Sequence, residues 1–122
     1  EIDHPEVLSA DVVVALSQEA YKKFAKTVKV GGLLIVDADR VETSADFNGV
    51  KIPVARIAHE TTGRAITANT VALGVLVGLT NLVSRDAIEK AITARAPKGT
   101  QEMNRKALRA GFAAAEQVQA VA

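Results

Sequence analysis

The chain has 122 residues, the size of one domain, and 48% of them are apolar while 24% are charged, an ordinary composition for a globular protein. Its formal net charge is only +1 and aromatic residues make up 3% of the chain. It therefore lacks both the basic excess that attracts nucleic acid and the rings that stack on bases. We expect a single α/β domain over residues 1–122 with no nucleic-acid partner.

The absence of cysteine from the sequence excludes disulfides, thiolate nucleophiles, cysteine-type zinc sites and cysteine-ligated iron–sulfur clusters from this chain. The longest apolar stretch, residues 71–79, is well short of the ~20 residues that a membrane-spanning helix needs. No basic stretch followed by an apolar one opens the chain, as it would in a signal peptide. We expect a cytoplasmic protein without a membrane partner.

The first predicted element is a strand over residues 11–16 (DVVVAL), because an unbroken run of β-branched and apolar residues is typical of a strand covered on both faces. Ser17 is a good N-cap for a helix that follows at once. The apolar stripe predicted for this helix consists of Ala20, Phe24 and Val28.

Gly31 and Gly32 are predicted to end that helix, since glycine supplies the left-handed conformation common at helix ends. Residues 33–36 (LLIV) then form a second buried strand that stops at Asp37. Strand, helix and strand make a βαβ unit, whose crossover is nearly always right-handed, so the two strands should be parallel.

A polar stretch over residues 39–49 predicts a loop, and residues 52–58 (IPVARIA) predict a third strand. Pro53 cannot donate to a ladder, which assigns it to the start of that strand or to a sheet edge. Helices are predicted for the rest of the chain: residues 69–83, a second from the N-cap Ser84 to about Arg95, and a third after the N-cap Thr100. The predicted fold is a three-layer α/β domain with a mainly parallel sheet and a C-terminal run of helices.

The predicted helix over residues 69–83 is apolar nearly all round and contains Gly74 and Gly78. Each interior glycine costs about 1 kcal/mol relative to alanine, so a close neighbour must compensate. Two neighbours fit this requirement: the domain's own sheet, or a second subunit.

The candidate binding site is the junction of the first strand and its helix, where Ser17 and Gln18 stand. Ligands of α/β sheets bind at the carboxyl ends of strands, and the free N–H groups of a helix N-terminus attract anions. A phosphate or carboxylate could therefore dock there. The alternative is that Ser17 only caps the helix.

Catalytic residues are not predicted for this chain. Asp37 and Asp39 close the second strand, as in the acidic pocket of phosphoryl-accepting receiver domains, but no lysine closes a late strand here, so we interpret them as solvated loop carboxylates. The histidines are His4 and His59, the latter beside Glu60, and neither has the spacing of a nucleophile–base pair. No metal site or nucleotide-binding glycine motif is recognised. A basic group near the C-terminus is either a solvated face or a docking patch: Arg95, Lys98, Arg105, Lys106 and Arg109.

Five ordered segments together resemble the gamma subunit, or gamma domain, of the 2-oxoacid:ferredoxin oxidoreductases, the family that includes the pyruvate and 2-oxoglutarate enzymes. They span almost the whole chain: ALSQEAY (15–21), GGLLIVDAD (31–39), IPVARIAHE (52–60), NTVALGVLVGLTNLVS (69–84) and APKGTQEMNRKALRAG (96–111). The first of them is most similar to the 2-oxoglutarate branch. Met103 and Leu108 depart from the family pattern, in which Leu and Phe are more usual.

The resemblance implies a division of labour in oxidative decarboxylation of a 2-oxoacid to an acyl-CoA. Thiamine diphosphate and iron–sulfur clusters, which pass electrons to ferredoxin, belong to alpha, beta and delta type subunits. This chain alone would bind no cofactor, would wall the active site as a scaffold, and could contact coenzyme A. Two other classes of protein stay open: a non-enzymatic α/β interaction domain, and a domain that binds a phosphate or nucleotide at the helix N-terminus capped by Ser17.

The family domain begins with a strand and a glycine-rich turn that this sequence lacks, so the chain is expected to correspond to its C-terminal two-thirds. Without that strand, the one predicted over residues 11–16 has an open apolar edge. We expect that the chain is not a free monomer.

Overall fold

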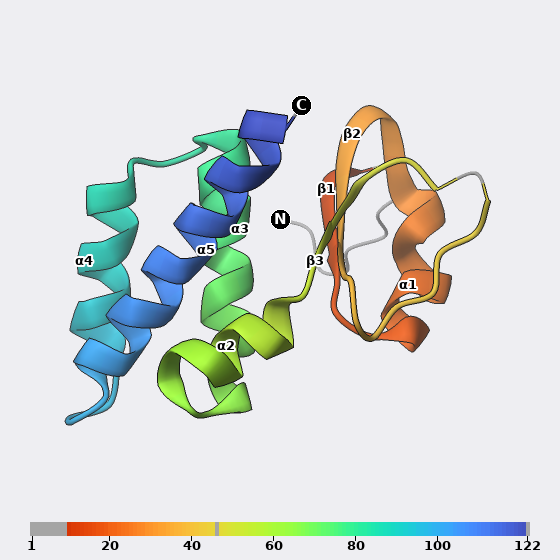
Figure 1. Ribbon diagram of the computed structural model, residues 1–122. Helices are drawn as coiled ribbons and strands as arrows, with labels where there is room; N and C mark the ends of the chain where they lie inside the picture. The colour runs from red at the N-terminus through yellow and green to blue at the C-terminus, as the bar shows by residue number, and fades with distance from the viewer. Residues whose placement is uncertain (1–9, 46, 122) are drawn as a thin grey trace, which may run out of the picture. The chain divides into compact units, whose positions relative to one another are not determined.

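The computed structural model describes residues 10–45 and 47–121. Its internal contacts divide the chain into two compact units, Glu1–Pro53 and Val54–Ala122, which we call the N-terminal and the C-terminal unit. Each is a continuous stretch of sequence, and each is considered by itself (Figure 1).

The N-terminal unit contains a parallel sheet in the order β1-β2-β3. Its elements are β1 (Ala10–Ala15), α1 (Gln18–Phe24), a short 3-10 turn η1 (Ala25–Thr27), β2 (Val28–Asp37) and β3 (Val50–Ile52). In the β1–β2 ladder Val12 lies opposite Leu33 and Ala15 opposite Val36. The predicted parallel βαβ unit is confirmed.

The crossover between β1 and β2 differs from the prediction. The helix ends at Phe24, seven residues before Gly31, and both Gly31 and Gly32 lie inside β2. β-Branched Val28 and Val30 favour extended chain over helix. Ala10 pairs with Val28 but Val12 with Leu33, so β2 advances five residues while β1 advances two, which is a bulge.

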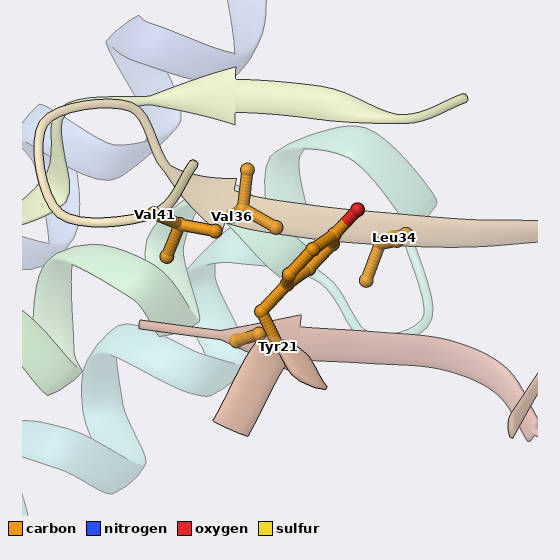
Figure 2. Packing of buried hydrophobic residues seen from close by; sticks show 5 residues of the cluster. Tyr21, Leu34, Val36 and Val41 are labelled. Atoms are coloured by element: carbon orange, nitrogen blue, oxygen red, sulfur yellow. The ribbon is translucent and has the colours of Figure 1, made fainter. Parts of the chain in front are cut away.

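The apolar core of the N-terminal unit forms around Tyr21. Figure 2 shows its ring reaching from α1 to Leu34 and Val36 of β2 and to Val41 of the following loop. The predicted stripe is wrong at two of its three residues: Ala20 packs against this core, but Phe24 is 44% exposed and Val28 belongs to β2. Because α1 ends after seven residues, its buried face is the one that carries Tyr21.

The predicted third strand is largely wrong. β3 ends at Ile52, and residues 54–58 belong to α2 (Val54–Thr62). Pro53 separates them, since proline disfavours the helical conformation in the residue before it and removes a ladder donor. Val54 and Ala58, one helical turn apart, are the buried residues of α2, so the apolar pattern there has a helical period. β3 is parallel to β2, with Val36 opposite Lys51.

The C-terminal unit is helical, as predicted for residues beyond 68. After η2 (Ala65–Thr67) come α3 (Ala68–Thr80), α4 (Arg85–Arg95) and α5 (Gln101–Val121). α3 ends three residues before the predicted boundary at 83, because Asn81 adopts the left-handed conformation with φ 54° and closes it. Ser84 caps α4 as predicted, its hydroxyl accepting from the Ala87 N–H at 3.0 Å. Thr100 precedes α5, but its hydroxyl donates to the Pro97 carbonyl at 2.6 Å instead.

α3 and α5 lie side by side in Figure 1, and glycines permit their close approach. A Cβ built on Gly74 would lie 2.2 Å from the Leu108 carbonyl oxygen, and one on Gly111 would lie 2.2 Å from that of Val71. Val77, Leu108 and Phe112 form the buried cluster beside this contact. The close neighbour of the α3 glycines is therefore α5 of the same chain, where the sequence analysis expected the sheet or a second subunit.

The α/β class, with its parallel sheet and C-terminal run of helices, is confirmed, while the three-layer arrangement stays a prediction. Within the residues that the structure describes, no helix combines the length and apolarity needed to cross a membrane.

Candidate functional site

The carboxyl edge of the parallel sheet holds the site residues that the sequence singles out. Ala15, the last residue of β1, pairs with Val36, the residue before the end of β2. The chain leaving β1 at Ser17 and the chain leaving β2 at Asp37 therefore emerge at the same edge, where α/β proteins bind ligands.

Ser17 and Gln18 both make structural hydrogen bonds at this edge. The Ser17 hydroxyl accepts from the Ala20 N–H at 3.1 Å, which is the N-cap bond of α1. The Gln18 side chain donates from Nε2 to the Glu42 carbonyl at 3.0 Å and accepts from the Glu42 N–H at Oε1. This amide therefore pairs with the backbone like a strand neighbour and fastens the loop after β2 to the start of α1.

Asp37 is 1% exposed, so its description as a solvated loop carboxylate is wrong. Its Oδ1 accepts from the N–H of Asp39 at 2.9 Å and from that of Arg40 at 3.2 Å. A buried carboxylate requires hydrogen-bond donors, and these two N–H groups supply them. The resulting turn folds the chain back immediately after β2. Asp39 itself is exposed.

Tyr21 forms a further hydrogen bond between α1 and the loop after β2, which the sequence analysis missed. Its hydroxyl accepts from the Ser44 N–H at 3.2 Å and lies 3.3 Å from the Ser44 hydroxyl. With the Gln18–Glu42 pair, this bond holds the loop against α1 at two points. The signal was present, since Tyr21 is the chain's single tyrosine and a buried tyrosine usually finds a hydrogen-bond partner.

The two histidines belong to other segments of the chain. His59 and Glu60 are exposed on α2, in the C-terminal unit, and His4 lies outside the described residues. Among residues 10–45 and 47–121, no group of three His, Asp or Glu side chains could hold a metal ion.

Part of the predicted basic group is paired with acidic residues. Arg109 binds Glu89 through two hydrogen bonds of 2.8 Å, joining α5 to α4, and Arg105 lies 3.6 Å from the same carboxylate. The Arg109 hydrogen bonds lower the pKa of Glu89, and burial opposes them. The same pair raises the pKa of Arg109. Arg95, Lys98 and Lys106 are exposed, and the docking-patch alternative rests on these three.

The Ser17 and Gln18 side chains both make structural hydrogen bonds at the carboxyl edge of the sheet. Their predicted role in holding an anion is compatible with this, since backbone N–H groups rather than side chains would be the donors at a helix N-terminus. It stays a prediction.

A scan of protein families matches residues 1–114 to the pyruvate ferredoxin/flavodoxin oxidoreductase family. Among curated proteins, the KorC subunit of 2-oxoglutarate synthase from Methanocaldococcus jannaschii is 44% identical over 121 residues. That alignment covers 96% of this chain and 65% of the relative, so the chain spans just under two-thirds of the relative's length.

Solved structures agree with the sequence comparisons. The gamma subunit of a keto/oxoacid ferredoxin oxidoreductase from Geobacter sulfurreducens superposes with a TM-score of 0.81 at 39% identity, over 88% of this chain and 65% of that one. A 2-oxoglutarate:ferredoxin oxidoreductase from Magnetococcus marinus, solved with 2-oxoglutarate, coenzyme A and succinyl-CoA bound, matches 89% of this chain and 20% of its own with a TM-score of 0.71 at 25% identity.

Proposed function

The chain belongs to the pyruvate ferredoxin/flavodoxin oxidoreductase family, and from that premise we propose that it is the gamma subunit of a 2-oxoacid:ferredoxin oxidoreductase. The proposed reaction is the oxidative decarboxylation of 2-oxoglutarate to an acyl-CoA, with electrons delivered to ferredoxin. The observation that carries the proposal is the 44% identity to a 2-oxoglutarate synthase subunit along 96% of this chain. A ketoisovalerate oxidoreductase subunit is 35% identical over 119 residues, so a branched 2-oxoacid is the competing substrate.

The residues of this chain do not fit an iron–sulfur cluster or the metal ion that accompanies thiamine diphosphate. The sequence offers no thiolate ligand, and the described part has no group of three His, Asp or Glu side chains placed to hold a metal. Both groups, and the electron transfer they carry out, are therefore assigned to alpha, beta and delta type partner subunits in a cytoplasmic complex.

The proposed role of this chain is to position the active-site wall. The Gln18–Glu42 pair and the Tyr21–Ser44 bonds hold the loop after β2 in a defined place at the carboxyl edge of the sheet. A wall built from such tied segments excludes water and orients a bound acid without taking part in bond breaking. Contact with a phosphate of coenzyme A at the N–H groups after Ser17 belongs to the same proposal.

Purification of the tagged chain from its native host, followed by an activity assay, tests this function. We expect it to copurify with a thiamine- and iron–sulfur-containing protein, and the complex to reduce methyl viologen when given coenzyme A and 2-oxoglutarate. Pyruvate and 2-oxoisovalerate serve as substrate controls, and the complex depleted of this chain serves as the protein control. Recovery of the chain without any thiamine-binding partner, or full activity after its depletion, would overturn the proposal.

A further inference from the structure

A pocket of about 560 Å³ opens in the N-terminal unit, between α1 and the loop that precedes β3. Its size falls in the range of small-molecule sites. α1 and η1 form one wall, Leu34 of β2 forms the floor, and the loop forms the other wall. The lining residues are Tyr21, Lys22, Ala25, Lys26, Leu34, Ser44, Phe47 and Asn48.

Hydrogen bonds and packing contacts hold the residues around the pocket in place. Tyr21 is bonded to Ser44 across it, and its ring packs against that of Phe47 with centroids 6.3 Å apart and planes tilted by 57°. Gly49 brings the loop onto β2 so closely that a Cβ there would lie 2.3 Å from the Leu34 carbonyl oxygen. Both walls are therefore fixed to the sheet, and the apolar surface between them is preformed.

Two of the residues that line the pocket, both on the same wall, carry positive charge. Lys22 lies in α1 and Lys26, four residues later, in η1, so two like charges that repel each other stand on the same wall. In the part of the chain that the structure describes, no carboxylate lies within ion-pair distance of either ammonium group. Lys51, which is not among the lining residues, has its ammonium group 5.4 Å from the centre of the Phe47 ring. An anion placed between the two lysines would remove the repulsion.

We propose that this pocket binds a small organic anion, whose carboxylate or phosphate lies between Lys22 and Lys26 and whose apolar body contacts Tyr21, Leu34 and Phe47. The combination of an apolar floor with two cations on one side selects this class over inorganic anions and over neutral molecules. Asn48 and Ser44 offer polar groups opposite the lysines for a second polar end of the ligand. The proposal is independent of the proposed function, since it rests only on the N-terminal unit.

Binding in this pocket can be followed by the intrinsic fluorescence of the chain, because the chain has one tyrosine and no tryptophan. Its ultraviolet fluorescence therefore comes from Tyr21 alone. We would titrate the 122-residue chain with hexanoate and hexyl phosphate, which do not absorb at the excitation wavelength. Acetate and inorganic phosphate supply the charge without the apolar body, and 1-hexanol supplies the body without the charge.

Hexanoate and hexyl phosphate should each change the fluorescence saturably and bind at least about tenfold tighter than acetate and inorganic phosphate, because each buried methylene adds affinity. The two arms distinguish a carboxylate ligand from a phosphate ligand. No saturation with either, equal affinity for inorganic phosphate and hexyl phosphate, or equal affinity for 1-hexanol and hexanoate would overturn the proposal.

A pair of variants tests the lysines. Lys22→Gln with Lys26→Gln should weaken hexanoate binding about tenfold, as expected for two exposed charge contacts. Lys23→Gln with Lys90→Gln removes the same net charge from lysines outside the pocket lining and should leave the affinity within about twofold. Far-ultraviolet circular dichroism verifies that both variants are folded. Equal losses in the two variants would show that net charge, rather than this pocket, attracts the anion.

Discussion

Gly74→Ala tests the packing of α3 on α5 most directly. The new methyl group would stand 2.2 Å from the Leu108 carbonyl oxygen and 3.0 Å from the Gly111 Cα. Both are backbone atoms in a helix, so no side chain can rotate away, and the helices must separate by about 1 Å. A gap of that size forfeits a quarter to a half of the dispersion energy of each contact across it.

The expected destabilisation is worked from two opposing effects. Overpacking against rigid backbone costs about 3 kcal/mol, the upper part of the usual range, while replacing an interior glycine by alanine regains about 1 kcal/mol of helix propensity. The net loss is about 2 kcal/mol, which lowers the melting temperature of a unit this size by about 10 °C.

Urea unfolding followed by circular dichroism at 222 nm measures this loss. Gly78→Ala is the matched control, because a Cβ there would meet one close obstacle, the Ala115 Cβ at 2.6 Å, and its next neighbour lies 3.5 Å away. Its loss should therefore be smaller than that of Gly74→Ala. A Gly74→Ala protein as stable as the wild type would refute the close approach, since propensity alone would then decide the outcome.

Three other predictions follow from residues described above. Ser17→Ala should cost about 1 kcal/mol of stability through the lost N-cap bond. In steady-state assays of the assembled enzyme, neither Ser17→Ala nor His59→Ala should reduce turnover a thousandfold. A loss that large would show that the substituted residue is catalytic. Because its pairing with Arg109 lowers the pKa of Glu89, the pair stabilises the fold above the unfolded glutamate pKa of about 4.3 and loses this effect as pH falls through the lowered value. Glu89→Gln should therefore be less stable than wild type at pH 7 and equally stable near pH 2 in urea titrations, and a difference that persists in acid would contradict the ion pair. Size-exclusion chromatography with light scattering should give a mass above the 12.8 kDa of one chain, and a monomer that persists at every concentration would contradict the expected assembly.

The parallel β1–β2 pair and the helices beyond residue 68 could be predicted because their signals are local and agree with one another. Unbroken apolar runs mark buried strands, and Ser84 caps α4 as its residue type suggests. The failures occurred where two local rules conflict. Residues 54–58 are apolar enough for a strand, but Pro53 and the one-turn spacing of Val54 and Ala58 decide for a helix.

The candidate site was predicted only in its location. Sequence reasoning placed Ser17 and Gln18 at the carboxyl end of a parallel strand, where the structure has them. The bonds of Gln18 to Glu42, 24 residues away, and of Tyr21 to Ser44, 23 residues away, depend on how a loop without regular structure folds back. No periodicity encodes such pairings, so they required coordinates.

The division at Pro53 has a consequence for how the protein is made. Each unit is one uninterrupted segment of chain, so neither has to wait for distant sequence before its own contacts can form. During synthesis the βαβ unit is complete before the first turn of α2 has been translated, and domains generally fold as such units in order of emergence. In the C-terminal unit the main helix contact joins α3 to α5 across the intervening α4, so this unit can close only after α5 has been made. We therefore expect the two units to fold in succession.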